Sequence, residues 1–218
     1  MVELPEGWAI ALADGVSTSA LAAQAAELAV QVSLQYLREH PQTPLTERLA
    51  QAVLAAHAAL LALPYEADGP LVEPQATLVL AELHGLELGY AWVGDSRLYV
   101  FDHAAQAMTR DDSWVNDQLD AGAAPEQLKF NPNLHSITQC LGMRDATPDV
   151  HVRQAELVPG MRVLLCSDGL WNYLDDASQM DAALADGGND LAQLCQYLVL
   201  VANASGGQDN VTVAVGQV

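Results

Sequence analysis

The spacing of apolar residues changes near Gln75, and this change constrains the fold more than any other feature of the sequence. Before it, apolar residues in Leu21–Tyr36 and Leu49–Leu63 recur every three or four positions, which predicts two helices with one buried face each. After it, the period changes to two, which is typical of strands. We expect Thr43 to cap the second helix and Pro44 to occupy its first position.

Strands are expected through much of the remaining chain. A hairpin is predicted where His84-Gly85 separates two apolar runs, because glycine accepts the positive φ that such turns need. The predicted strands are Gly7–Ala13, Thr77–Leu83, Leu86–Val93, Arg97–Phe101, Val150–Gln154, Met161–Cys166 and Val211–Val215. The further helical segments are predicted at Trp114–Ala121, at Leu170–Leu174, after Asp176 and at Asp190–Asn203.

The order of these elements indicates the fold class. Strands in meander order, with helices grouped before and after them, favour an α+β fold over alternating β-α-β units. The strands are strongly apolar, so the economical arrangement is an αββα sandwich of two antiparallel β-sheets flanked by helices. We expect a single domain over residues 1–218, because no repeat or linker divides it. Residues 112–135 are polar and irregular, which predicts a surface flap.

The chain is strongly acidic. Eight Lys and Arg residues stand against 28 Asp and Glu residues, which gives a net charge of −20 with histidine neutral. Such a surface repels phosphate backbones and anionic lipid, so we expect neither nucleic-acid nor membrane binding. The chain starts without a basic and apolar leader, so we expect a cytoplasmic protein. Three widely spaced cysteines favour neither a disulfide framework nor a zinc site.

Four aspartates lie at the ends or starts of apolar strands, most of them beside a glycine: Asp14, Asp95, Asp168 and Asp209. A carboxylate fixed in such a place is costly to desolvate unless a cation pairs with it. Because basic side chains are so few, a bound metal is the better candidate cation, and oxygen-only ligands favour Mg²⁺, Mn²⁺ or Ca²⁺ over zinc. Each aspartate taken alone could instead cap a turn, since aspartate is a preferred turn residue.

The segments around these aspartates resemble, in order and in rough spacing, the motifs of the bacterial PPM-type (type 2C) metal-dependent protein serine/threonine phosphatases. They read Asp14-Gly15, Gly94-Asp95-Ser96-Arg97, Cys166-Ser167-Asp168-Gly169-Leu170-Trp171 and Asp209-Asn210-Val211-Thr212-Val213. Two further stretches, Thr109-x-Asp111-Asp112-Ser113 and Thr138-x-x-Leu141-Gly142, also resemble the family. The resemblance extends from about Gly7 to Val215 and implies the same αββα sandwich.

The resemblance implies a role for each acidic motif. Asp14 is similar to the carboxylate that bridges two metals, and Gly15 to the residue that offers its backbone carbonyl to one of them. Asp168 and Asp209 are similar to the remaining carboxylates of the first metal. Asp95 is similar to the residue that, with Asp168, holds a third and weaker metal in bacterial members.

The implied activity is hydrolysis of phosphoserine and phosphothreonine in proteins. Two Mg²⁺ or Mn²⁺ ions would share and activate a water, so that no side-chain nucleophile is required. The implied substrates are phosphorylated proteins modified by a Ser/Thr kinase.

Two departures from the family pattern support an alternative. Members normally begin with a strand pair that carries a phosphate-gripping Arg and an Asn/Glu-x-Asp stretch, and we expect this hairpin to be missing before Gly7. After Asp14-Gly15, the usual Gly-rich continuation is replaced by Val16-Ser17-Thr18-Ser19, as can occur in members joined to a kinase domain. The alternative is a catalytically weak or inactive phosphatase-like regulatory domain, part of a longer kinase-linked protein.

Four further residues are candidates for binding substrate: Ser17, Thr18, Arg97 and Asn210. The hydroxyls of Ser17 and Thr18 could bind phosphate, or could instead cap the helix that follows. Arg97 could contact phosphate, or could hold the turn beside Asp95 by hydrogen bonding. The flap is the expected place of substrate selection, because loops on a rigid scaffold carry specificity. None of the six histidines is assigned to catalysis.

Overall fold

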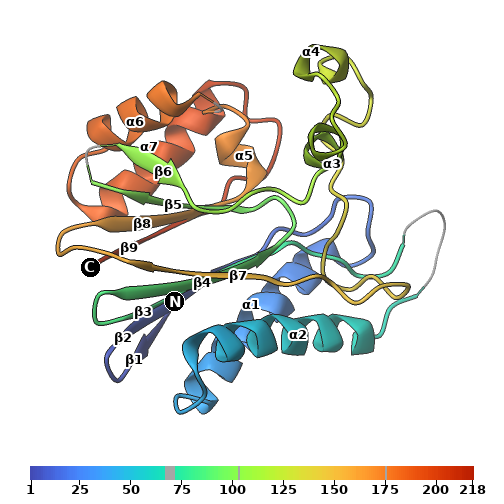
Figure 1. The fold of residues 1–218 in the computed structure, drawn as a ribbon. Coiled ribbons are helices and arrows are strands. Elements are labelled where there is room, and N and C mark those ends of the chain that lie inside the picture. Colours follow the sequence, from blue (N-terminus) through green and yellow to red (C-terminus); the bar gives the residue numbers. More distant parts are fainter. Residues whose placement is uncertain (67–71, 103, 175) are drawn as a thin grey trace.

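The computed structural model of the protein describes residues 1–66, 72–102, 104–174 and 176–218, so that His103 lies outside it. In the described part, two antiparallel sheets are stacked face to face and helices cover both outer faces (Figure 1). This is the αββα sandwich that the order of elements predicts, and the predicted fold class is confirmed. The stacking brings strand ends from the two sheets together at one edge of the molecule.

The first sheet contains five strands: β1 (Val2–Leu4), β2 (Gly7–Leu12), β3 (Leu78–His84), β4 (Glu87–Val93) and β7 (His151–Glu156). Their order is β1-β2-β3-β4-β7, and every neighbouring pair is antiparallel. Gly85 closes the predicted β3–β4 hairpin with φ at 62°.

The second sheet contains β5 (Arg97–Phe101), β6 (Ala105–Ala107), β8 (Arg162–Cys166) and β9 (Val213–Gln217), in the order β6-β5-β8-β9. The chain passes from the first sheet to the second at Gly94-Asp95-Ser96, so the meander expected from the sequence is interrupted there. Gly94 has φ at 101°, and a Cβ at this position would lie 2.7 Å from Cγ2 of Thr77. The crossing turn therefore packs tightly against the residue before β3.

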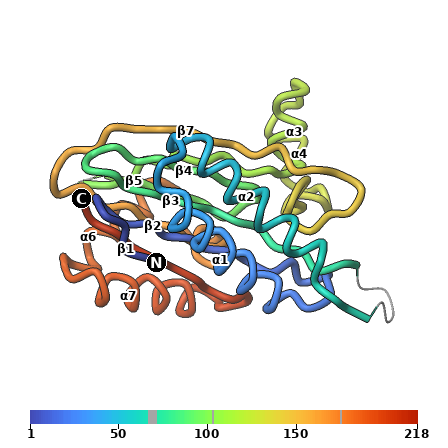
Figure 2. Tube along the Cα trace, turned by 90° about the horizontal axis from the view of Figure 1, so that it is seen from below, coloured from blue at the N-terminus to red at the C-terminus, as the bar shows by residue number. Residues whose placement is uncertain are grey.

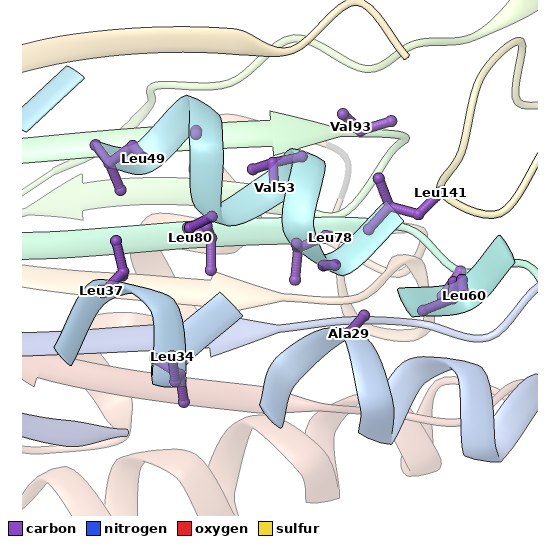
Figure 3. Close-up of a cluster of buried hydrophobic side chains, with 14 of the residues drawn as sticks. Ala29, Leu34, Leu37, Leu49, Val53, Leu60, Leu78, Leu80, Val93 and Leu141 are labelled. Atoms are coloured by element: carbon purple, nitrogen blue, oxygen red, sulfur yellow. The ribbon is translucent and has the colours of Figure 1, made fainter. Parts of the chain in front are cut away.

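The two long helices, α1 (Ala22–Glu39) and α2 (Leu45–Ala62), cover the outer face of the first sheet (Figure 2). Their apolar faces meet buried side chains of β3, as Leu37, Leu49 and Leu80 illustrate (Figure 3). The stripes with a spacing of three or four residues thus correspond to this contact.

Two other apolar layers complete the core. Between the sheets, buried residues such as Ile10 and Leu98 pack face to face. The outer face of the second sheet is covered by α5 (Asp168–Trp171), α6 (Ala177–Asp186) and α7 (Leu191–Ala204). Among the described residues, no helix combines the length and the apolar character that crossing a bilayer requires.

The start of α2 differs from the prediction. Pro44, and not Thr43, is the N-cap, and the helix begins at Leu45. The loop before it is held by Arg48, whose Nη1 donates to the carbonyl oxygens of Pro41 and Thr43 at 2.8 and 2.7 Å. Arg48 also forms a buried ion pair with Glu82 of β3. The ion pair therefore fixes the first turns of α2 against a strand 34 residues further along the chain.

Several short elements were not predicted. Strands β1 and β6 have three residues each, too few for an alternating pattern to be recognised. The segment 112–135 contains α3 (Trp114–Asp120), which was predicted, and α4 (Pro125–Leu128), which was not; both extend away from the sandwich (Figure 1). Its role as a flap and the single domain stay predictions, as does the lack of the Arg-bearing strand pair of the family. The hairpin that β1 and β2 form was not predicted.

Leu21 offers a test of local backbone strain. It precedes α1 with φ at 54° and ψ at 34°, in the left-handed region that disfavours leucine, and its side chain makes no capping hydrogen bond. We expect Leu21→Asn to raise the free energy of unfolding by roughly 1 kcal/mol, because asparagine tolerates this conformation and is a preferred cap.

Denaturant unfolding would measure the change. Leu86→Asn is the matched control, because Leu86 is similarly exposed, at 41% against 39% for Leu21, but does not share its positive φ. Equal effects of the two substitutions on stability would contradict the assignment of strain to Leu21.

Candidate metal centre

The four predicted aspartates reach one place from both sheets. Asp14 follows β2, Asp95 lies in the turn between β4 and β5, Asp168 follows β8, and Asp209 precedes β9. They line a single cavity of about 150 Å³. Gly15 and Ser17 line the same cavity, so all five predicted metal-binding residues and one of the predicted substrate-binding residues lie together.

Burial and mutual repulsion disfavour the ionised form of three of these carboxyl groups, those of Asp14, Asp95 and Asp168. Desolvation, followed by the neighbouring Asp168, raises the pKa of Asp14 to about 7. Desolvation and the same neighbour raise the pKa of Asp95 to about 7. The pKa of Asp168 is also raised, by burial first and by Asp209 second. Because the ionised carboxylates are destabilised in this way, the cavity favours a positively charged ligand.

The donor set fits a hard divalent cation. In the described part of the chain, Oδ1 of Asp168 is a buried side-chain atom without a hydrogen-bond partner. An unpaired buried carboxylate oxygen costs free energy, and a cation can satisfy it. The remaining candidate ligands are carboxylates and the Gly15 carbonyl, which suit Mg²⁺ or Mn²⁺.

The carboxylates would have to draw closer to enclose an ion. Among the residues that the structure describes, no three His, Cys, Asp or Glu side chains already form a group that could hold one. Like charges separate unless a cation lies between them, so rotation of the four side chains is the expected response to binding.

Backbone and side-chain hydrogen bonds fix the turns that carry the aspartates. Trp171 donates from Nε1 to the carbonyl oxygen of Asp95 at 2.9 Å. The buried hydroxyl of Ser167, next to Asp168, donates to the carbonyl oxygen of Asn210 at 3.2 Å and accepts from the Thr212 amide at 3.1 Å. These bonds join the turns of Asp168 and Asp209 within the second sheet.

Arg97 is committed to a partner that the sequence did not identify. Its Nε and Nη2 donate to Asp111 at 2.8 and 2.7 Å, and its guanidinium lies 3.6 Å from the centre of the Trp171 ring. The expected hydrogen bonding beside Asp95 is therefore replaced by a bidentate pair with Asp111. Arg97 lines a neighbouring cavity of about 430 Å³ together with Asp95 and Asp168.

The other predicted substrate-binding residues lie around the cavity in different ways. Ser17 and Thr18 are exposed, and neither caps α1, whose N-cap position is occupied by Leu21. The suggested capping role is therefore wrong. Thr18 is not among the residues that line the 150 Å³ cavity, and Asn210 donates its amide to the Asp209 carboxylate at 2.7 Å.

Sequence reasoning missed four residues of this cavity: Val16, Thr77, His135 and Ile137. Thr77 was read as the start of a strand, and it lies one residue before β3. His135 and Ile137 follow a segment without periodicity, where no pattern indicates which side chains turn inward. The proline and asparagine breakers at 131–133 were the available signal that the chain changes direction there.

Comparison with known protein families identifies the family of this chain. The family model described as "Protein phosphatase 2C" matches residues 1–195. The chain belongs to this family. The resemblance stated from the aspartate motifs is thereby confirmed.

Individual relatives agree with the assignment to the protein phosphatase 2C family. The chain is 31% identical over 211 residues to the serine/threonine protein phosphatase PstP of Mycobacterium tuberculosis, which covers 96% of this chain and 40% of PstP. It is 37% identical over 129 residues to the protein phosphatase PhpP of Streptococcus pneumoniae, which covers 58% of this chain and 51% of PhpP. The chain thus spans about half or less of the length of these relatives.

Solved structures show the same fold. The catalytic domain of PstP in complex with two manganese ions aligns with a TM-score of 0.76 at 32% identity, covering 95% of this chain and 85% of that domain. The serine/threonine phosphatase of S. agalactiae aligns with a TM-score of 0.79 at 25% identity, covering 95% and 85% of the two chains.

Proposed function

We propose that the chain catalyses metal-dependent hydrolysis of phosphoserine and phosphothreonine in proteins. The observation that carries this proposal is the meeting of Asp14, Asp95, Asp168 and Asp209 in one cavity. Membership of the protein phosphatase 2C family supports it, as does the two-manganese complex of the PstP catalytic domain.

Each aspartate has a distinct place in the proposed centre. Asp14, the Gly15 carbonyl, Asp168 and Asp209 would hold two Mg²⁺ or Mn²⁺ ions, and Asp95 with Asp168 would hold a third. Such cations lower the pKa of a water and neutralise phosphoryl charge when bound. The chain's own residues supply the negative charge that retains them, and the partial burial of Asp14, Asp95 and Asp168 strengthens the attraction.

We propose that substrate reaches the centre along the 430 Å³ cavity. This cavity shares Asp95 and Asp168 with the metal centre and is lined on its other side by Val115 and Leu134 of the flap segment. Ser17, exposed at the rim of the centre, would donate its hydroxyl to a phosphoryl oxygen. Thr18 and Asn210 would bind the substrate further out.

Arg97 would act mainly as a wall of the substrate cavity. Its bidentate pair with Asp111 and its contact with Trp171 leave little freedom to follow a phosphate. Arg97 would therefore orient the substrate through its position and its partly screened charge.

The substrates are proposed to be proteins phosphorylated by a Ser/Thr kinase. A cytoplasmic location is proposed with them, in keeping with Cys140, Cys166 and Cys195 as free thiols.

Removal of metal tests the proposed function. Phosphate release from a phosphothreonine peptide should proceed with Mn²⁺ and fall to the uncatalysed rate when a chelator is added, because no side-chain nucleophile replaces the metal-activated water. Readdition of Mn²⁺ in excess should restore the rate, which separates metal loss from denaturation. Equal rates with Mn²⁺ and with chelator would refute the proposal.

A further inference from the structure

Two buried hydroxyl groups connect the turn after β2 with the turn that crosses between the sheets. Thr77 precedes β3 in the first sheet, and Ser96 precedes β5 in the second. Their Oγ1 and Oγ atoms are 2.8 Å apart, and the residues are 3% and 1% exposed. Two hydroxyls this deeply buried need partners, so their contact is a strong constraint on the two segments.

Thr77 also forms two hydrogen bonds with the backbone of Asp14. Its amide donates to the Asp14 carbonyl oxygen at 2.8 Å, and its Oγ1 accepts from the Asp14 amide at 3.1 Å. The backbone of the first candidate ligand is therefore held on both sides by one residue. When Oγ1 accepts this bond, its own proton remains available for Ser96, which satisfies both polar atoms of the threonine side chain.

The methyl group of Thr77 contacts the other turn. A Cβ on Gly94 would lie 2.7 Å from Cγ2 of Thr77, so the turn before Asp95 closes directly onto this methyl group. Ser96 follows Asp95 in the chain. Thr77 thus contacts the residues flanking Asp95 with both branches of its side chain while it binds the backbone of Asp14.

We propose that Thr77 and Ser96 are positioning residues whose hydroxyl pair sets the distance between Asp14 and Asp95 and so shapes the cation site. The inference rests on the proposed function, since it concerns the site that function requires. Neither hydroxyl needs to touch the cation or the substrate. Their effect is exerted through the backbone of the two turns, one from each sheet.

The test compares Mn²⁺ affinities by isothermal titration calorimetry. Thr77→Val keeps the shape of the side chain but removes the hydroxyl, and Thr77→Ser keeps the hydroxyl. We expect Thr77→Val and Ser96→Ala each to weaken Mn²⁺ binding about tenfold, which is about 1.4 kcal/mol, and Thr77→Ser to stay within about twofold. The double variant should bind no more weakly than about tenfold, because the two hydroxyls act as one unit.

A control separates positioning from general loss of stability. Ser33→Ala also removes a buried hydroxyl, one that donates to the Val30 carbonyl oxygen at 3.1 Å within α1, and it lies outside both the 150 Å³ and the 430 Å³ cavities. We expect it to lower the free energy of unfolding while Mn²⁺ affinity is unchanged. Loss of affinity equal to that of Thr77→Val would overturn the inference, because the effect would then be generic.

Two further outcomes are decisive. Wild-type Mn²⁺ affinity in Thr77→Val and Ser96→Ala would overturn the inference and leave the proposed function intact, whereas a wild-type protein that binds no Mn²⁺ would refute the proposed function itself. If Thr77→Val does not fold, the Mn²⁺ affinity of Ser96→Ala is compared with that of the wild type instead. Ser96→Ala leaves the hydrogen bonds between Thr77 and Asp14 in place.

Discussion

Replacing Asp168 by asparagine is expected to abolish Mn²⁺-dependent phosphate release while the protein remains folded. Asp168 is shared by the proposed ligand sets, and its Oδ1 is buried without a partner in the described part of the chain. Loss of a residue that only supports a ligand typically costs roughly 10–100-fold, so loss of a shared ligand should cost more. An amide is neutral and cannot replace the charge of the carboxylate.

The folding of Asp168→Asn should not suffer. The raised pKa of Asp168 reflects burial and repulsion by Asp209, so a neutral amide relieves an unfavourable interaction in the metal-free protein. Steady-state hydrolysis of a phosphothreonine peptide and thermal unfolding in chelator measure the two effects.

Asp186→Asn is the matched control for this substitution. It makes the same chemical change on the exposed side of α6 and should leave the rate unchanged. Asp209→Asn should behave as Asp168→Asn does. Full activity in either Asp168→Asn or Asp209→Asn would mean that the assigned ligands are wrong.

The metal-free protein is expected to lose stability as the pH rises from about 4 to about 7. Asp14 and Asp95 have folded-state pKa values of about 7, whereas an unfolded chain gives about 3.9. Between these values the folded state binds more protons than the unfolded state, so the free energy of unfolding falls with rising pH. The contribution is fully present below the unfolded pKa and is lost as the pH passes the folded one.

The size of this effect has an upper limit. One group that titrates fully in the folded state contributes at most about 1.4 kcal/mol per pH unit, and the shared repulsion among the aspartates makes the sum smaller than separate contributions. Denaturant unfolding in chelator at several pH values would measure the slope. The slope should be shallower in Asp14→Asn, and saturating Mn²⁺ at pH 7 should restore the lost stability.

A stability that rises with pH over this range in the metal-free wild type would contradict the prediction. So would an identical slope in the wild type and in Asp14→Asn, because the titration would then belong to other groups.

The elements that the sequence predicts are those whose signal is local. The apolar stripes of α1 and α2 and the apolar runs of β3 and β4 each extend over many residues, so they can be recognised without knowledge of the fold. The two strands are buried on both faces, so the expected period of two is not what marks them. The aspartates were identified because each lies at the boundary between an apolar strand and a turn. Their meeting in one cavity also agrees with the expectation, although their roles as ligands stay predictions.

The features that escaped the sequence depend on distant partners. Arg97 pairs with Asp111, 14 residues along the chain, and Arg48 pairs with Glu82, 34 residues along it. Thr77 is of a residue type that is common in strands, and its proposed positioning role depends on its hydrogen bonds with Asp14 and Ser96. Such pairings follow from how the sheets stack, which no pattern within a short window encodes.

The four aspartates are widely separated along the chain, so the complete cation site exists only in the fully folded protein. Asp14 depends on the first sheet, Asp168 and Asp209 depend on the second, and Asp95 depends on the crossing between them. A partly folded intermediate with one sheet formed would present only a fragment of the donor set. Divalent cations would therefore bind the fully folded protein more tightly than partly folded intermediates. By mass action, they would shift the folding equilibrium toward the complete sandwich.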